Sequence, residues 1–170
     1  MKIDTVRGDI TAERVDAIVN AANTRLQRGA GVCGAIFAAA GPDLDPACAA
    51  IGRCEIGDAV VTPGFELPAR WIVHTVGPVW HGGDRDEPAL LASCYRRSIE
   101  VALTVGAASI AFPAISTGIF GYPADAAAAV AVTTVTTTAR RHADQLELVR
   151  LVAFDDATLR AYRDRLDAVD

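Results

Sequence analysis

The sequence predicts an α/β sandwich, a fold in which helices cover both faces of one sheet. Short apolar runs alternate along the chain with longer segments of helical periodicity. Several of these runs are apolar at consecutive positions, as expected for strands that are buried on both faces. A length of 170 residues fits one domain with one core and is short for two, so residues 1–170 are expected to form a single domain.

Six apolar runs are expected to form the strands. The run at 109–115, Ser-Ile-Ala-Phe-Pro-Ala-Ile, is the strongest of them, and the last run is almost continuously apolar. The expected strands are Ile3–Val6, Val15–Val19, Ala59–Val61, Trp71–Val76, Ser109–Ile115 and Leu148–Phe154.

Four segments are expected to form helices. The first is rich in alanine and stops at Gly41-Pro42, which is a common stop signal. Residues 130–138 of the third are rich in β-branched side chains and locally favour a strand, but Pro123 at the first turn favours a helix. The expected helices are Val32–Ala40, Pro88–Val105, Pro123 to about His142, and Asp156–Leu166.

Charge and hydropathy exclude several classes of partner. The formal net charge is −5, whereas a broad phosphate-binding face is usually basic, so extended nucleic-acid binding is not expected. No apolar run approaches the length of a membrane span, and the N-terminal residues enter the first strand without a signal peptide. We therefore expect a cytoplasmic protein with no membrane partner.

The cysteines and histidines do not have metal-site spacing. Cys33, Cys48, Cys54 and Cys94 form no C-x-x-C pair, and the three histidines lie far apart in the sequence. We expect free thiols in a reducing compartment, with no metal ion and no cofactor.

Three polar or glycine-bearing segments follow expected strands, which is where open α/β sheets bind ligands. The first is Gly8-Asp9-Ile10-Thr11. The Asp9 carboxylate can accept a hydrogen bond from an exocyclic amine or a ribose hydroxyl. It can equally be a turn or helix-cap residue, and this segment alone favours the cap.

The second segment combines Asn20-Ala21-Ala22-Asn23 with Gly29-Ala30-Gly31-Val32-Cys33-Gly34. Glycines before a helix let backbone amides approach a diphosphate, although they also suit a flexible turn. The spacing G-x-G-x-x-G is present, but eight residues separate it from the strand and no acid ends a strand about twenty residues later. A phosphate loop is therefore retained and a nicotinamide-dependent oxidoreductase is disfavoured.

The third segment, 116–123, reads Ser-Thr-Gly-Ile-Phe-Gly-Tyr-Pro and opens a helix. Its Ile119-Phe120 pair is either a wall for a sugar or base, or a hydrophobic staple at the helix start. His74 is interpreted as a core or near-cleft histidine rather than a catalytic base. Phe154, at the end of the last expected strand, either packs or stacks on an adenine.

These residues resemble the macrodomain family, and its MacroD-type branch in particular. The resemblance runs almost end to end and is carried by Val6–Thr11, by Val15–Asn23, by Gly57–Pro78 and by Pro113–Pro123. It implies a three-layer α/β/α fold with a mixed, mainly parallel sheet of about six strands, and ADP-ribose as the ligand.

The resemblance also assigns places in the site. It implies that Asp9 and Ile10 hold the adenine and that Phe154 flanks it. It implies that Asn23 binds the distal ribose hydroxyls with Asn20 in support. The remaining implied residues surround the diphosphate and the distal ribose: Gly31, Val32, Cys33, Ser116, Thr117, Gly118, Ile119 and Phe120.

The function implied is hydrolysis of mono-ADP-ribose from Asp or Glu side chains of modified proteins, with O-acetyl-ADP-ribose as a second substrate. Asn23, Cys33 and Phe120 are the expected catalytic residues, water activation is expected to be substrate-assisted, and a monomer is expected. One departure matters, because MacroD-type hydrolases typically carry Asp where this chain has Cys33. That change favours the alternative, a reader module that binds ADP-ribosylated targets without cleaving them.

Overall fold

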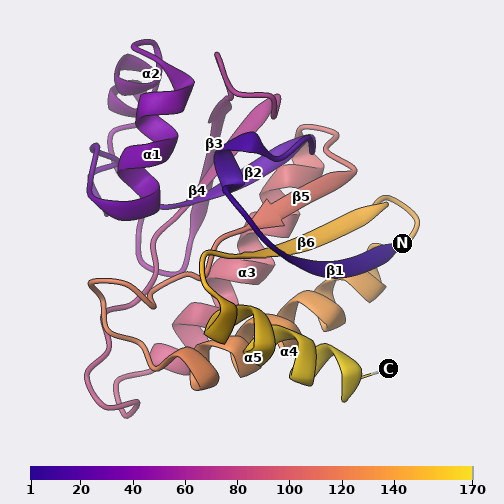
Figure 1. The fold of residues 1–170 in the computed structure, drawn as a ribbon. Helices are drawn as coiled ribbons and strands as arrows, with labels where there is room; N and C mark the ends of the chain where they lie inside the picture. The colour runs from indigo at the N-terminus through magenta and orange to yellow at the C-terminus, as the bar shows by residue number, and fades with distance from the viewer. Residues whose placement is uncertain (170) are drawn as a thin grey trace.

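The computed structural model describes residues 1–169, which form one sheet flanked by helices (Figure 1). The strands are β1 (Lys2–Arg7), β2 (Ala17–Ala21), β3 (Ala59–Pro63), β4 (Trp71–Thr75), β5 (Ser109–Phe112) and β6 (Leu148–Ala153). The helices are α1 (Gly31–Ala40), α2 (Leu44–Ile51), α3 (Glu87–Thr104), α4 (Ala124–Arg141) and α5 (Asp156–Asp167), with a 3-10 turn, η1, at Ile10–Ala12.

The six strands are ordered β1-β6-β5-β2-β4-β3. All neighbours pair in parallel except β3 and β4, which are antiparallel. The expected mixed, mainly parallel sheet is therefore confirmed. Because β1, β2, β5 and β6 run in the same direction, their carboxyl ends meet at one edge, and the loops that follow them are brought together there.

Two hydrophobic cores lie on opposite faces of the sheet. On one face Ile18 packs with Ile36 of α1 and Leu44 of α2, and on the other Val19 shares a core with Tyr95 of α3. Helices α4 and α5 complete that second layer (Figure 1). Consecutive residues of β2 thus point into different cores, which explains why its sequence is continuously apolar.

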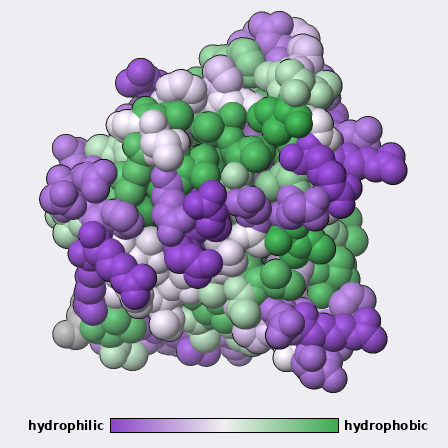
Figure 2. Space-filling model, turned by 180° about the vertical axis from the view of Figure 1, so that it is seen from behind, coloured by the Kyte–Doolittle hydropathy of each residue, from purple (hydrophilic) through white to green (hydrophobic). Residues whose placement is uncertain are grey.

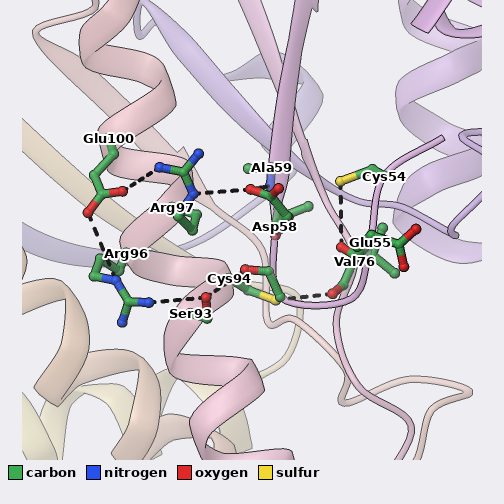
Figure 3. A network of polar contacts seen from close by, with 12 residues as sticks. Cys54, Glu55, Asp58, Ala59, Val76, Ser93, Cys94, Arg96, Arg97 and Glu100 are labelled. Carbon is green, nitrogen blue, oxygen red and sulfur yellow. Dashed lines mark hydrogen bonds and ion pairs between the residues drawn. The ribbon is translucent and has the colours of Figure 1, made fainter. Parts of the chain in front are cut away.

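The edge strand β3 is fastened to α3 by a polar network. Arg97 Nε donates to Asp58 Oδ1 at 3.1 Å, and the same oxygen accepts the Ala59 amide at 2.8 Å (Figure 3). Arg97 also pairs with Glu100, so one guanidinium bridges the helix and the start of the strand. The backbone carbonyl of Val76 accepts the Cys94 thiol at 3.2 Å, which adds a contact between α3 and the end of β4 (Figure 3).

The structure departs from the sequence prediction at element ends and at one helix. Helix α2 was not predicted, because it has only 8 residues, includes Pro46 and lies between Gly41 and Gly52. The strand expected at 109–115 ends at Phe112, since Pro113 has no N–H for the ladder. The last strand ends at Ala153, which leaves Phe154 outside the sheet.

Hydrophobic and hydrophilic side chains are mixed on the surface that faces away from the viewer in Figure 1. Figure 2 shows hydrophobic areas that are separated by hydrophilic residues. Within residues 1–169, no helix is both long and apolar enough to cross a bilayer. The same residues contain no group of three or more His, Cys, Asp or Glu side chains placed to hold a metal ion.

Candidate functional site: a two-compartment cleft at the carboxyl edge of the sheet

A cleft with two compartments lies where the loops after β1, β2, β5 and β6 meet. The larger compartment has a volume of about 570 Å³ and the smaller about 270 Å³. Gly31, Val32, Ala114 and Gly118 line both, so the compartments adjoin between α1 and the loop after β5. All but one of the predicted site residues line this cleft, and the exception is Asn20.

The larger compartment combines apolar surface with one carboxylate. Ile10 is buried in its wall, while Phe154 is 88% exposed beside it. Asp9 lies at the same end and caps η1, because its Oδ1 accepts the Thr11 amide at 2.9 Å and the Thr11 hydroxyl at 2.7 Å. The cap interpretation is thus confirmed, and the second carboxylate oxygen remains able to accept a bond from a ligand.

The first turn of α1 presents backbone amides to the cleft. Its N-cap residue, Ala30, has no side chain that could accept them, and Gly31 adopts a φ of 60°. The first helical bond comes from Gly34, whose amide donates to the Ala30 carbonyl at 3.4 Å. The amides of the preceding helical residues are left for a ligand, and the helix dipole favours an anion there.

The loop after β5 forms the opposite wall. Ser116 has a φ of 66°, an uncommon conformation for a residue other than glycine. Ile119 is 88% exposed, so it does not pack as a hydrophobic staple, whereas Phe120 is half-buried. Gly118 lies between the compartments, and a Cβ there would meet no atom within 4 Å. Open space, rather than packed side chains, surrounds the Cα of this glycine.

Asn23, Cys33 and Phe120 come together in the smaller compartment. The Asn23 side chain holds its own turn, because Nδ2 donates to the Gln27 carbonyl at 2.7 Å and Oδ1 accepts the Gln27 amide at 3.0 Å. One N–H and one lone pair of this amide remain available for a ligand. Cys33 is buried, and its Sγ lies 3.8 Å from the same Gln27 carbonyl.

Asn20 lies behind the cleft in a fully buried polar chain. Its Nδ2 is 3.7 Å from Cys33 Sγ and 3.1 Å from His74 Nδ1, and His74 Nε2 is 2.9 Å from Thr62 Oγ1. Burial lowers the pKa of His74 to about 4, so this ring is neutral at physiological pH. His74 is a core histidine, as its sequence context predicted, and Asn20 contacts Cys33 rather than the cleft itself.

Several residues in and beside the cleft were not predicted from the sequence. Pro113 and Ala114 were assigned to a strand, although they line the larger compartment. Gln27 received no role, yet its backbone joins Asn23 to Cys33. The proline within the apolar run was the available signal for the first error. The second could not be read from the sequence, because backbone contacts do not depend on residue type.

The fold and this cleft define an α/β/α sandwich domain with a two-compartment cleft at the carboxyl edge of its sheet. The Macro domain family matches residues 19–131, and the chain belongs to that family.

Similar proteins cover almost the whole chain. It is 51% identical to a Macro domain-containing protein of Chlorobaculum tepidum over 98% of this chain and 96% of the relative. A protein of Klebsiella pneumoniae named O-acetyl-ADP-ribose deacetylase is 51% identical to this chain. The match covers 94% of this chain and 93% of the relative.

Solved macrodomain structures have the same fold. An Oceanobacillus iheyensis macrodomain with ADP superposes with a TM-score of 0.91 at 40% identity, over 97% of this chain and 90% of that one. A Trypanosoma brucei macrodomain in complex with ADP-ribose superposes with a TM-score of 0.91 at 38% identity. The match covers 96% of this chain and 68% of that one.

Proposed function

We propose that this chain binds ADP-ribose in the cleft and hydrolyses ester bonds at its distal ribose. The observation that carries the proposal is the meeting of the two compartments between the α1 amides and Gly118. A diphosphate would lie at that junction, the adenine beside Ile10 and Phe154, and the distal ribose beside Asn23 and Phe120. The ADP-ribose complex of the Trypanosoma brucei macrodomain supports this choice of ligand.

The substrates proposed are proteins that carry mono-ADP-ribose on Asp or Glu. Water would attack the anomeric carbon of the distal ribose, and the bond from that carbon to the carboxylate oxygen would break. The products are ADP-ribose, the free carboxylate and a proton. Because a carboxylate is a tolerable leaving group, positioning can supply much of the lowering of the barrier.

O-acetyl-ADP-ribose is proposed as a second substrate, since it also carries an ester on the distal ribose. Two relatives that are 51% and 48% identical to this chain are named O-acetyl-ADP-ribose deacetylase. They support the hydrolysis of ADP-ribose esters.

Cys33 is proposed to shape the compartment rather than to act as the base. A thiol becomes reactive where a base, a cation or a helix N-terminus favours the thiolate, and Cys33 has only the last of these, because it lies in the first turn of α1. The neighbours of Cys33 Sγ are the Asn20 amide and the Gln27 carbonyl, and Asn20 lies between it and His74. We therefore propose that the diphosphate of the substrate and the α1 backbone hold the attacking water.

The second candidate is a reader module that binds ADP-ribosylated proteins without cleaving them. The observation that favours it is Cys33, which stands where MacroD-type hydrolases carry an acid. Incubation with a protein carrying carboxyl-linked mono-ADP-ribose, and separately with O-acetyl-ADP-ribose, distinguishes the two by the release of ADP-ribose or acetate. Calorimetric binding of ADP-ribose without either release would support the reader.

We further propose that the protein acts as a monomer in the cytoplasm. Its four cysteines are all free and buried, which suits a reducing compartment. Fractionation of cells that produce a tagged form, and light scattering of the purified protein, test the two statements.

A further inference from the structure

The loop at 79–86 contacts the part of the cleft wall that carries Phe120. The Trp80 amide donates to the Phe120 carbonyl at 2.8 Å. The Trp80 indole also packs on the Tyr122 ring, with centroids 4.5 Å apart and planes at 50°. Trp80 therefore holds the cleft loop by its backbone at one residue and by its side chain two residues further on.

The hydrogen bond from the Trp80 amide is the main polar restraint on the cleft loop, which is segment 116–121. Within the described residues 1–169, the other hydrogen bonds of segment 116–121 are made to residues between 114 and 122. They link Gly121 to Gly118, Tyr122 to Ser116, and Thr117 to Ala114. The bond from Trp80 is the one that ties Phe120 to a distant part of the chain.

The position of Trp80 depends in turn on Glu87, the first residue of α3. Glu87 is 1% exposed, and its two carboxylate oxygens accept the backbone amides of His81 and Arg85, each at 2.9 Å. Burial raises the pKa of Glu87, but the backbone N–H groups of the loop lower it by more, so the carboxylate stays ionised. One buried charge thus clamps both sides of the turn.

The turn between these two amides approaches the Trp80 ring at Gly83. Gly83 has a φ of 92°, and a Cβ there would lie 2.8 Å from the indole. Gly82 also has a positive φ, of 101°. The loop backbone therefore lies close against the indole, and releasing the turn from Glu87 would free the ring to move.

We propose that Glu87 and Trp80 are positioning residues that fix Phe120 over the distal ribose. The part of this statement that concerns turnover rests on the proposed hydrolase function. Neither residue touches the ligand. They act through the Phe120 carbonyl, and they determine how tightly the reacting sugar is oriented.

Asp16 supplies a matched control. Its carboxylate accepts the backbone amides of Ala108 and Ser109 at 2.8 and 3.0 Å, at the edge of the sheet opposite the cleft. Glu87→Ala and Asp16→Ala therefore each remove a carboxylate that accepts two backbone amides. One lies beside the cleft and the other at the opposite edge of the sheet. Glu87→Gln keeps one acceptor and serves if the alanine variant does not fold.

The kinetic test compares these variants at a temperature at which each is folded. We expect Glu87→Ala to lower kcat on a carboxyl-linked substrate by about tenfold or more and to change KM by less than about threefold, since a misplaced reacting group costs rate more than binding. Asp16→Ala should keep the kcat of the parent protein.

A second readout does not need turnover. Trp71 and Trp80 are the two tryptophans, so Trp71→Phe leaves Trp80 as the reporter. ADP-ribose should change its emission in this background, and Glu87→Ala should abolish most of that change while Asp16→Ala keeps it.

Equal kinetics and equal emission changes in the two alanine variants would overturn the positioning role and leave the hydrolase intact. Absence of release by the parent protein, with the emission difference preserved, would overturn the hydrolase alone. Absence of any ADP-ribose binding by the parent would overturn both.

Discussion

The side-chain amide of Asn20 lies 3.1 Å from the ring nitrogen Nδ1 of His74, and both side chains are fully buried. Because Asn20 Nδ2 can only donate, Nδ1 of the neutral ring accepts from it, and the ring N–H at Nε2 donates to Thr62 Oγ1. The Thr62 hydroxyl in turn donates to the Pro63 carbonyl at 3.2 Å. A chain of hydrogen bonds thus runs from the edge strand β3 to Asn20, whose amide contacts Cys33 at the cleft.

His74 should make folding stability depend on pH in a mildly acidic range. Its pKa is about 4 in the folded protein and 6.5 ordinarily, so the unfolded chain binds the proton more readily. Above pH 6.5 this group adds no pH dependence, and stability falls as the pH decreases from about 6.5 to about 4. Urea unfolding at pH 7 and pH 5 should differ by about 2 kcal/mol from this residue.

His74→Gln, which does not titrate, should remove that difference even if it lowers stability at both pH values. His142→Gln is the control, because His142 is half-exposed at the end of α4. Equal pH dependence in the His74 variant and the parent protein would contradict a neutral buried histidine.

Asp9 should contribute to ligand affinity through the oxygen that does not cap η1. Asp9→Asn can keep the cap on the Thr11 amide while it replaces the free acceptor by a donor. We expect calorimetry to show a loss of about 1.5–3 kcal/mol in ADP-ribose binding for both Asp9→Asn and Asp9→Ala, the range for hydrogen bonds to charged groups. An unchanged affinity in a folded variant would remove Asp9 from the site.

Gly118 tests the place of the diphosphate. Because no atom lies within 4 Å of a Cβ built at this position, Gly118→Ala and Gly118→Glu should both fold with nearly the parent melting temperature. The glutamate adds bulk and negative charge where the compartments meet, so it should abolish ADP-ribose binding, whereas alanine should retain much of it. If Gly118→Glu still binds, the diphosphate lies elsewhere.

The layers of the fold and the edge of the sheet that holds the cleft could be predicted, because both depend on the local sequence pattern. The buried pair Ile18 and Val19 shows the two-sided burial that the continuous apolar runs predicted. Asp9, Gly31 and Gly118 were found because each follows a strand, and the carboxyl ends of parallel strands meet at one edge.

The supporting contacts were not predictable, because they join distant segments of the chain. The bond between Thr62 and His74 crosses a strand pair whose register the sequence does not state. Glu87 directly precedes the predicted helix Pro88–Val105, and its contacts to the loop depend on backbone amides that any sequence has. Helix α2 escaped detection since 8 residues give too little periodicity.

Cys33 and Asn23 should differ in their effect on turnover. Sγ of Cys33 is placed by the Asn20 amide and has no base beside it, so Cys33→Ala should keep activity within about tenfold, or 1.4 kcal/mol of barrier. Asn23→Ala should lose more, because the same amide holds the turn through Gln27 and has one N–H left for the reacting ribose. Misplacing that sugar by about 1 Å can cost a hundredfold.

Initial rates at saturating carboxyl-linked substrate separate these effects from binding. Cys33→Ser is the matched control, since a hydroxyl can accept from Asn20 as the thiol does. A Cys33→Ala variant that binds ADP-ribose but releases none, with activity in the serine variant, would give the side chain a direct role in activating water and would contradict substrate assistance. If instead Asn23→Ala turns over as fast as the parent protein, then Asn23 only holds its own turn, and the contact that orients the distal ribose comes from elsewhere in the smaller compartment.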